Sequence, residues 1–358
     1  MPETLPNTKR FPIDGLLQWF GENQRDLPFR PTAQRKPNPY HVLISEAMAQ
    51  QTQIATVVPY FHRFVAAFPT VHDLADAEEQ AVLNLWQGLG YYSRARNLRK
   101  AARMIVDEFG GEVPRTPEEL LQLPGVGRYT AGAVASVAYN TVAPIVDGNV
   151  ARVFARYFGI TDPVNQPAGQ KKLWALAAEL VAASGSPRDF NQGVMELGAL
   201  VCTPKPGRGD GCVDCPLSDT CVAHATGREK ELPVKAPKKK PIAVTHTVLA
   251  VERGGRYLFE QRPGNGLWAN MWQLPTLETG DITSAPAHLE DRFRLKISET
   301  KPVTRFTHQT THRTICFEVH QCSVEAGRLR PGRGQWRTPD NLQDLPLAKP
   351  QQTAVSHL

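Results

Sequence analysis

Two carboxylates have positions suited to acid–base chemistry. Glu46 lies in ISEAMAQQTQI at the edge of an apolar helical stripe, where burial would raise the pKa of its carboxyl group and keep it protonated near neutral pH. Asp147 lies in the polar break of PIVDGNVARVF, where it can cap the next helix and still face a ligand. Judged singly, a surface glutamate and a helix cap explain both residues, so other features of the chain must decide.

A bulky tyrosine stands at the mouth of a helix of small residues in LPGVGRYTAGA. Gly125 and Gly127 precede Tyr129, and glycine takes positive φ freely and lets another backbone come close. The helix that follows offers unpaired N–H groups at its N-terminus, so the turn could hold a phosphate. An ordinary connection between two helices is the simpler interpretation of this stretch taken alone.

Four cysteines make the strongest local signal in the chain. They follow the pattern C-x9-C-x2-C-x5-C and are Cys202, Cys212, Cys215 and Cys221. Four thiolates this close in sequence can surround one zinc ion or an iron–sulfur cube. Both centres accept four cysteine ligands, so the pattern alone leaves the two open.

The whole chain has the composition of a globular protein with a polyanionic partner. Its 358 residues include 41 Lys and Arg against 35 Asp and Glu, a net charge of +6, and 41% are hydrophobic. The excess of positive charge favours nucleic acid as the partner. The sequence has neither an apolar leader nor a run of about 18 apolar residues, so we expect a cytoplasmic protein without a membrane span, whose thiols stay reduced.

Helical and β-rich signals divide the chain at a charged, proline-rich linker. From Phe11 to about Ala225 the periodicity is helical, as in HVLISEAMAQQTQIATVVPYFHRFV. The stretch GREKELPVKAPKKKP is expected to be extended and solvated. Beyond it, two β-rich runs flank an Arg-Gly-Gly turn, and the strand TICFEVHQC places Cys316 and Cys322 on one face as structural free thiols. We therefore expect an all-α region followed by an α+β domain.

Several motifs occur together in an order that one family of repair enzymes shares. SEAMAQQTQ, LPGVGRYTAGA, VDGNVARV, the cysteine cluster and the β-rich tail resemble the MutY adenine DNA glycosylases, in the endonuclease III superfamily of helix-hairpin-helix proteins. The resemblance covers roughly Phe11 to Trp336. It implies a helical glycosylase region at 9–226, with a six-helix part at about 36–143 and a cluster part at about 9–35 and 144–226. A linker at 227–241 and a Nudix-like domain at 242–347 would follow.

The resemblance gives each reactive residue a role in cutting the bond between adenine and its sugar. Glu46 would protonate adenine at N7 and Asp147 would stabilise the cationic sugar, as the two carboxylates of glycoside hydrolysis do. Asn149 would help to place the water or Asp147. Related glycosylases that also cut the strand carry a lysine where this chain has Tyr129, and tyrosine cannot form their Schiff base. We therefore expect base removal without strand cleavage, after the adenine is flipped from the duplex.

Further residues would bind DNA by the same resemblance. Arg25 and Arg30 would line the adenine pocket, next to Phe29, where the family often has tryptophan. Gln51 and Tyr91 would wedge into the base stack. Contacts with phosphates would come from Arg94, Arg96, Gly125 and Gly127. For the two helical arginines, solvated helix ends are the alternative.

The C-terminal third resembles the MutT-like, Nudix-fold domain with which MutY recognises 8-oxoguanine opposite adenine. GLWANMWQLP and FTHQTTHRTICFEV carry this resemblance. Phe306, Thr307 and His308 match the family's Phe-Ser-His loop, and the threonine keeps the hydroxyl of the serine it replaces. The sequence lacks a glutamate-rich R-E-x2-E-E-x-G helix, so we expect this domain to read the lesion and not to hydrolyse nucleotides.

The resemblance also favours a four-iron four-sulfur cluster over zinc at the four cysteines, as a structural centre tied to DNA binding. Nine residues separate Cys202 from Cys212, where MutY relatives usually have six. Because a longer loop closes at modest entropic cost, all four cysteines remain the expected ligands.

These observations lead to one hypothesis and its rivals. We expect a monomeric, monofunctional adenine DNA glycosylase that acts on double-stranded DNA with A:8-oxoguanine or A:G mispairs, and that is associated with the nucleoid if the source is bacterial. One rival is a bifunctional, endonuclease III-like glycosylase/AP lyase. Another is a non-catalytic DNA-binding iron–sulfur protein in which Glu46 is only structural. A Nudix hydrolase is a third rival, against which the missing glutamate box counts.

Overall fold

The computed structural model describes residues 6–32, 34–204, 212–237 and 240–358. The chain forms two compact units, one of Met1–Ala75 with Lys100–Pro237 and one of Asp76–Arg99 with Lys238–Leu358. Most of the long loop between Cys202 and Cys212 lies outside the described residues. Within the described ranges, none of the helices has both the length and the apolar character needed to cross a membrane.

The first unit is helical. Its helices are α1 (Ile13–Asn23), α2 (Pro39–Ala49), α3 (Ile54–Ala67), α4 (Val71–Asp76), α7 (Pro117–Leu120), α8 (Arg128–Tyr139), α9 (Gly148–Phe158), α10 (Pro167–Ala183), α11 (Pro187–Leu200) and α12 (Val222–Ala225). Helix α5 (Glu79–Trp86) belongs to the second unit, and α6 (Ser93–Phe109) runs from the second unit into the first. Short 3-10 turns lie at Thr8–Arg10 and Ser218–Thr220.

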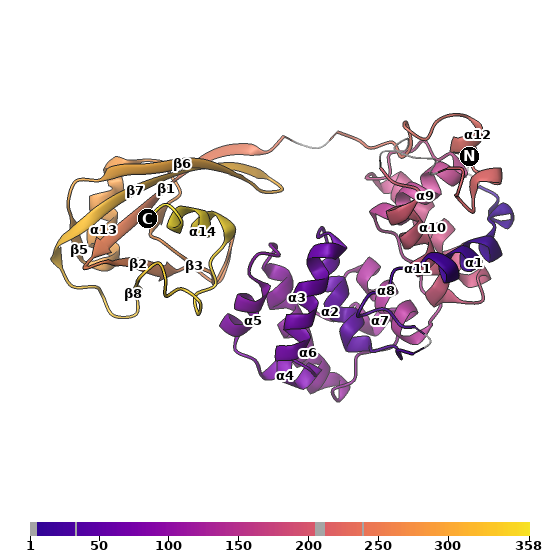
Figure 1. The fold of residues 1–358 in the computed structure, drawn as a ribbon, viewed down its shortest axis with the longest axis horizontal. Helices are drawn as coiled ribbons and strands as arrows, with labels where there is room; N and C mark the ends of the chain where they lie inside the picture. The colour runs from indigo at the N-terminus through magenta and orange to yellow at the C-terminus, as the bar shows by residue number, and fades with distance from the viewer. Residues whose placement is uncertain (1–5, 33, 205–211, 238–239) are drawn as a thin grey trace. The chain divides into compact units, whose positions relative to one another are not determined.

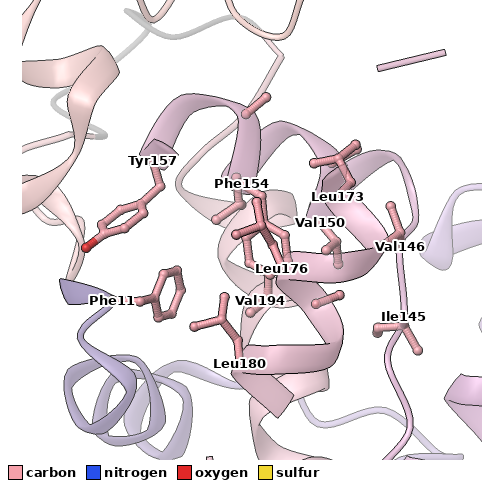
Figure 2. Packing of buried hydrophobic residues seen from close by; sticks show 14 of the residues in the cluster. Phe11, Ile145, Val146, Val150, Phe154, Tyr157, Leu173, Leu176, Leu180 and Val194 are labelled. Carbon is pink, nitrogen blue, oxygen red and sulfur yellow. The ribbon is translucent and has the colours of Figure 1, made fainter. Parts of the chain in front are cut away.

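One apolar core holds α9, α10 and α11 together (Figure 2). Val150 and Phe154 of α9, Leu176 of α10 and Val194 of α11 are almost fully buried in it. Burying one such side chain stabilises the fold by about 1.5–3 kcal/mol. This packing fixes the axis of α9, and therefore the position of Asp147 at its start.

Two glycines let the chain around Asp147 pack closely. A Cβ added at Gly132 of α8 would collide with the carbonyl oxygen of Pro144, on the segment that leads to α9. A Cβ at Gly198 of α11 would overlap with Asn149. Any larger side chain at either position would therefore displace the backbone that carries Asp147.

The C-terminal part of the second unit is a mixed sheet between helices, which confirms the expected α+β domain (Figure 1). Its strands are β1 (Ile242–Arg253), β2 (Arg256–Gln261), β3 (Trp272–Gln273), β4 (Thr276–Leu277), β5 (Leu295–Ile297), β6 (Lys301–Gln309), β7 (Arg313–Gly327) and β8 (Gln335–Arg337). The main order is β3-β2-β1-β7-β5, with β6 antiparallel to β7 and β1 parallel to β7. Helix α13 (Ala285–Phe293) covers one face of the sheet and α14 (Lys349–Val355) the other.

Local sequence explains two features of this sheet. Gly254 and Gly255, which have φ of 59° and 74°, form the expected turn between β1 and β2, because this tight hairpin needs positive φ at both positions. On β7, Cys322 is buried with the α13 face, opposite the core that holds Ile315 and Phe317. Cys316 is only partly buried, and neither cysteine forms a disulfide.

Within the second unit, α5 is joined to the C-terminal sheet by side-chain hydrogen bonds. Gln80 donates to the carbonyl of Asn270 over 3.2 Å and accepts from Nε1 of Trp272 over 3.2 Å. Gln87 accepts from the backbone N–H of Leu347 over 2.9 Å. A polar residue of α5 and the residue that caps its C-terminus therefore bind two separate segments of the C-terminal part.

Candidate functional site

A cavity of about 760 Å³ in the helical unit brings together most of the catalytic and pocket residues expected from sequence. This volume is typical of sites for small molecules. The expected residues that line it are Arg25, Arg30, Glu46, Gln51, Tyr129, Asp147 and Asn149. Phe29 also lines it, and its ring packs edge-on against Phe61 at 5.3 Å.

Glu46 sits in the last turns of α2, a helix whose start is capped by the Asn38 side chain. Its side chain is partly exposed to the cavity, and the surrounding protein still desolvates the carboxyl group. Burial raises the pKa of Glu46 to about 7, the nearby Asp147 adds to the rise, and the hydrogen bond with Tyr129 opposes it. The direction is the one expected from the sequence, and it leaves much of Glu46 protonated at neutral pH.

Tyr129 lies in the first turn of α8 and contacts both the carboxyl group of Glu46 and the thioether of Met195. Its hydroxyl donates to Sδ of Met195 over 3.4 Å and also interacts with the Glu46 carboxyl group. Burial raises the pKa of Tyr129 well above its ordinary value, and the charges of Glu46 and Asp147 raise it further. A phenol has one proton to donate. When that proton faces Met195, the phenol oxygen can accept a hydrogen bond from the protonated carboxyl group of Glu46.

Asp147 is the N-cap of α9, as its place before the helix predicts. Oδ1 accepts from the backbone N–H groups of Asn149 and Val150 over 2.9 and 2.7 Å. Oδ2 accepts from Nδ2 of Asn149 over 3.0 Å. Burial raises the pKa of Asp147, while these hydrogen bonds and the charge of Arg152 oppose the rise. Each of these contacts favours the ionised form of the carboxylate.

Asn149 is itself held in one orientation. Nη2 of Arg152 donates to Oδ1 of Asn149 over 2.8 Å and to the carbonyl of Gly198 over 2.7 Å. This fixes the Asn149 amide with its nitrogen toward Asp147. Nε of Arg152 donates to the carbonyl of Cys202 over 2.6 Å, so the same arginine also holds the start of the cysteine loop.

Glu196 of α11 is a cavity residue that sequence analysis missed. Its side chain is 2% exposed and pairs with Arg25 Nε at 2.7 Å and with Arg30 Nη2 at 2.9 Å. Burial alone would raise the pKa of Glu196, but hydrogen bonds from Arg25 and Arg30 lower it to about 2. Gln192, one turn earlier, accepts from Nε of Arg30 over 3.1 Å. The sequence contains a signal for this residue. Glu196 is a charged residue in the largely apolar helix NQGVMELGAL, one turn after Gln192 and therefore on the same face.

The two expected wedge residues share an unusual backbone conformation. Gln51 has φ of 58° and Tyr91 has φ of 50°, in the left-handed region that side chains rarely adopt. Both are exposed, Tyr91 by 46%. Within its own unit, the hydroxyl of Tyr91 lies 3.2 Å from Oγ1 of Thr311. A strained backbone position persists only where the surrounding fold holds it in place, and such positions are frequent at functional sites.

Arg94 and Arg96 are not the solvated helix ends that the alternative predicted, because both guanidinium groups bind protein carbonyls. Nη2 of Arg94 donates to the carbonyl of Gly90 over 3.1 Å, and its guanidinium lies over the Tyr91 ring. Nη1 of Arg96 donates to the carbonyl of Ala269 over 2.8 Å. Contact of either arginine with phosphate stays a prediction.

The glycine turn before α8 differs in part from the expectation. Gly125 has φ of 80°, as a tight turn requires. Gly127 has φ of −97° and ψ of 177°, so the expectation of positive φ at this position is wrong. The physical reason is that Gly127 is the N-cap of α8, and a helix is entered from extended backbone. Apart from Gly127 itself and its two neighbours in the chain, no atom of the described residues lies within 4 Å of a Cβ added there, so this surface is open to an approaching group.

In the C-terminal part, the expected lesion-contacting residues lie on strand β6, and the loop inferred from the family is wrong for this chain. The cause is the continuous antiparallel pairing of Phe306, Thr307 and His308 with β7. Phe306 stacks on Phe317 at 5.3 Å in the core, Thr307 is exposed, and the ring of His308 lies 5.9 Å from Trp268.

A buried carboxylate under α13 is neutralised by an arginine. Glu260 of β2 is 3% exposed and accepts from Nε of Arg292 over 2.7 Å and from Nε2 of Gln273 over 2.9 Å. Arg292 therefore neutralises a carboxylate that could otherwise serve as an acidic ligand of a divalent cation.

The four cysteines gather beside the core of α9 to α11. Nη1 of Arg156 lies 3.2 Å from Sγ of Cys202. Burial raises the pKa of Cys215 to about 12, and the other three cysteines are close enough to raise it further. Four neighbouring thiolates repel one another, and the positive charge of a bound metal centre stabilises them. The donor set therefore fits a metal centre with four sulfur ligands.

Comparisons with known proteins agree with this geometry. The model of the HhH-GPD superfamily of base excision DNA repair proteins matches residues 44–179, and a NUDIX domain model matches residues 246–357. The adenine DNA glycosylase of Rattus norvegicus is 37% identical, over 93% of this chain and 75% of its own length. That of Buchnera aphidicola subsp. Schizaphis graminum is 33% identical, over 94% and 95%. The structure of a thermostable thymine-DNA glycosylase has a TM-score of 0.53 at 32% identity, over 60% of this chain and 95% of its own.

A helical fold of this superfamily with two carboxylates in one cavity defines a DNA glycosylase of base excision repair, followed by a Nudix domain. At 31–37% identity to relatives from animals, plants, yeast and bacteria, the chain belongs to the adenine DNA glycosylases, the MutY family. This confirms the fold class and the enzyme class expected from the sequence. DNA is therefore the partner of this enzyme.

Proposed function

We propose that this glycosylase removes adenine mispaired with 8-oxoguanine or guanine, and that it leaves the DNA strand intact. The observation that carries the proposal is the pair of carboxylates in one cavity. Glu46 is desolvated and has a pKa of about 7, whereas Asp147 accepts three hydrogen bonds that favour its charge. One acid and one anion are what cleavage of a glycosidic bond requires.

In the proposed reaction, Glu46 gives its proton to N7 of the flipped adenine. The C1′–N9 bond then breaks, and its electron pair leaves with the neutral adenine. The ionised Asp147 stabilises the cationic sugar, with Asn149 holding the aspartate in place through Nδ2. Water adds to C1′ and gives its proton to the carboxylate of Glu46, which restores the acid. Adenine and an abasic site are the products.

Strand cleavage is not part of the proposed activity. A lyase step needs an amine that attacks C1′ and forms an imine. At the start of α8, the residue that lines the cavity is Tyr129, whose side chain has no amine. Its hydroxyl is engaged with Met195 and Glu46, and its raised pKa keeps it neutral. We propose that Tyr129 holds Glu46 and forms a wall of the adenine pocket.

We further propose that Arg25 and Arg30 shape the adenine pocket, together with Glu196. Gln51 and Tyr91 would enter the base stack, and their strained backbone supports this role. Contacts with phosphates would come from Arg94, Arg96 and the turn of Gly125 and Gly127. The sequence supports this assignment, and so does the open surface at Gly127.

The C-terminal domain is proposed to read the oxidised guanine through the β6 residues Phe306, Thr307 and His308. We propose domain limits of 9–226 and 242–347, a linker at 227–241, and a monomer that acts where chromosomal DNA lies. Exposed Thr307 offers the hydroxyl for the contact with the lesion. The Glu260–Arg292 pair supports a domain that binds and does not hydrolyse.

For the four cysteines we propose a four-iron four-sulfur cluster, which would serve as a structural centre. The sulfur-only donor set supports it. Zinc bound by four cysteines would bring the sulfur atoms to about 3.8 Å from one another, since Zn–S bonds are about 2.3 Å. In the described residues, the one group of three metal-binding side chains within 4.8 Å contains only one of these cysteines, which favours the larger cluster.

A single-turnover assay tests the proposal on duplexes that contain one A:8-oxoguanine, A:G or A:T pair. Strand breaks should appear only after alkali and only for the two mispairs, with none from a Glu46→Gln variant that still binds the duplex. Breaks without alkali would refute the assignment of Tyr129. Equal excision from A:T would refute the proposed mispair selectivity.

A further inference from the structure

We propose that His224 is a reserve ligand of the cysteine-bound metal centre, able to take the place of Cys212. The ligand atoms of Cys212, His224 and Glu229 lie within 4.8 Å of one another. Two donors on one tetrahedral metal ion lie about 3.6 Å apart, given metal–sulfur and metal–nitrogen bonds of about 2.3 and 2.1 Å. The limit of 4.8 Å is about 1 Å longer than this spacing, so a small movement of the side chains would let His224 and Cys212 bind the same metal ion. The inference rests on the metal centre assigned under the proposed function.

The Glu229 carboxylate orients the imidazole as metal-binding histidines are commonly oriented. Nδ1 of His224 lies 3.2 Å from Oε1 of Glu229. A carboxylate that accepts from one ring nitrogen fixes the tautomer and leaves the other nitrogen as a ligand. With Nδ1 held by Glu229, Nε2 of His224 is the nitrogen that remains to bind the metal, and Glu229 would be its positioning partner.

His224 is close in sequence to Cys221, the last of the four cysteines, on a helix that is anchored in the protein interior. It lies three residues after Cys221, on α12, whose Ala223 is fully buried. Cys212 follows Cys202 at the longest spacing of the four. Imidazole is an accepted ligand of iron–sulfur centres, in which histidine can replace cysteine. The ligand at the end of the long loop is thus the one that has a substitute within reach.

Four full-length variants test this assignment: Cys212→Ala, Cys215→Ala, His224→Ala and the double variant Cys212→Ala/His224→Ala. Iron and sulfide per chain are measured after anaerobic purification, and circular dichroism checks the fold. We expect Cys212→Ala and His224→Ala to keep iron within about twofold of the unsubstituted protein. Cys215→Ala and the double variant should lose iron by about tenfold or more, because each lacks a ligand and even loss of a residue that only supports a ligand lowers metal affinity about 10–100-fold.

Spectroscopy separates the outcomes. In Cys212→Ala, the paramagnetic state of the cluster should show nitrogen hyperfine coupling that disappears in the double variant. Iron loss in Cys212→Ala as deep as in Cys215→Ala would overturn the proposal, as would a three-iron cluster with one open position or equal iron in the single and double variants. Zinc without iron in the unsubstituted protein would instead refute the proposed cluster, and zinc content in the same variants would then decide whether His224 replaces Cys212.

Discussion

Replacing Glu46 by glutamine should stabilise the protein at neutral and alkaline pH while abolishing adenine release. Burial holds the pKa of Glu46 at about 7, against an ordinary value of 4.5. The difference of about 2.5, at 1.36 kcal/mol for each tenfold change in ionisation, corresponds to about 3 kcal/mol. This is the cost of ionising the carboxyl group inside the fold, and glutamine does not bear it.

The sign follows from proton binding. Between pH 4.5 and 7 the folded state holds a proton at Glu46 that the unfolded state releases, so stability contributed by this group falls as pH rises through that window. Well above pH 7 Glu46 is ionised in both the folded and the unfolded state, so the stability lost no longer changes with pH. The free energy of unfolding of Glu46→Gln should therefore match that of the unsubstituted protein near pH 4.5 and exceed it by about 3 kcal/mol at pH 8.

The assay is urea unfolding at several pH values, followed by tryptophan fluorescence and circular dichroism. The exposed Glu108→Gln variant of α6 is the matched control, because it makes the same change from carboxyl to amide on the surface of a helix. A difference for Glu46→Gln that is flat between pH 5 and 8 would show that Glu46 is not desolvated. That result would also remove the physical basis for its role as the acid.

Three further outcomes are expected. At subsaturating DNA, the excision rate should fall tenfold per pH unit above about 7, as Glu46 loses its proton; a flat rate to pH 9 would contradict this. In the same pH profile, Met195→Leu should move the falling limb to lower pH by about 0.5, because the Tyr129 hydroxyl is then free to donate to the Glu46 carboxylate. Tyr129→Phe should move the limb to higher pH, because it removes the hydrogen bond that lowers the pKa of Glu46. Arg30→Met should lower the free energy of unfolding by about 3 kcal/mol, measured in urea, because Glu196 would lose a partner in a buried ion pair; an unchanged midpoint would refute this.

Features set by neighbouring residues in the chain could be predicted from the sequence. Asp147 before an apolar helix is a helix cap because the signal lies within three residues. The Arg-Gly-Gly turn and the alternation of β7 are equally local. Glu46 could be placed at the edge of an apolar stripe by helical periodicity alone.

Features that depend on distant pairing could not be predicted in this way. Glu196 acquires its pKa of about 2 from Arg25 and Arg30, more than 160 residues earlier in the chain. The contact of Tyr129 with Met195 likewise joins two helices whose packing the sequence does not display. Helical periodicity identifies the buried face of α11 but not which side chains of other helices meet it.

Glu46 and Asp147, the two carboxylates of the cavity, are distinguished by their hydrogen bonds and not by burial, since burial raises the pKa of both. Asp147 has the backbone N–H groups of a helix start, the Asn149 amide and the Arg152 charge, all of which favour its anion. For Glu46 the contact that opposes the rise is the hydrogen bond with the Tyr129 hydroxyl, whose proton is shared with Met195. Environments that push two pKa values apart assign the acid and the anion. The charge of Asp147 also raises the pKa of Glu46, so in the proposed mechanism the anion that would meet the sugar also helps to keep the acid protonated.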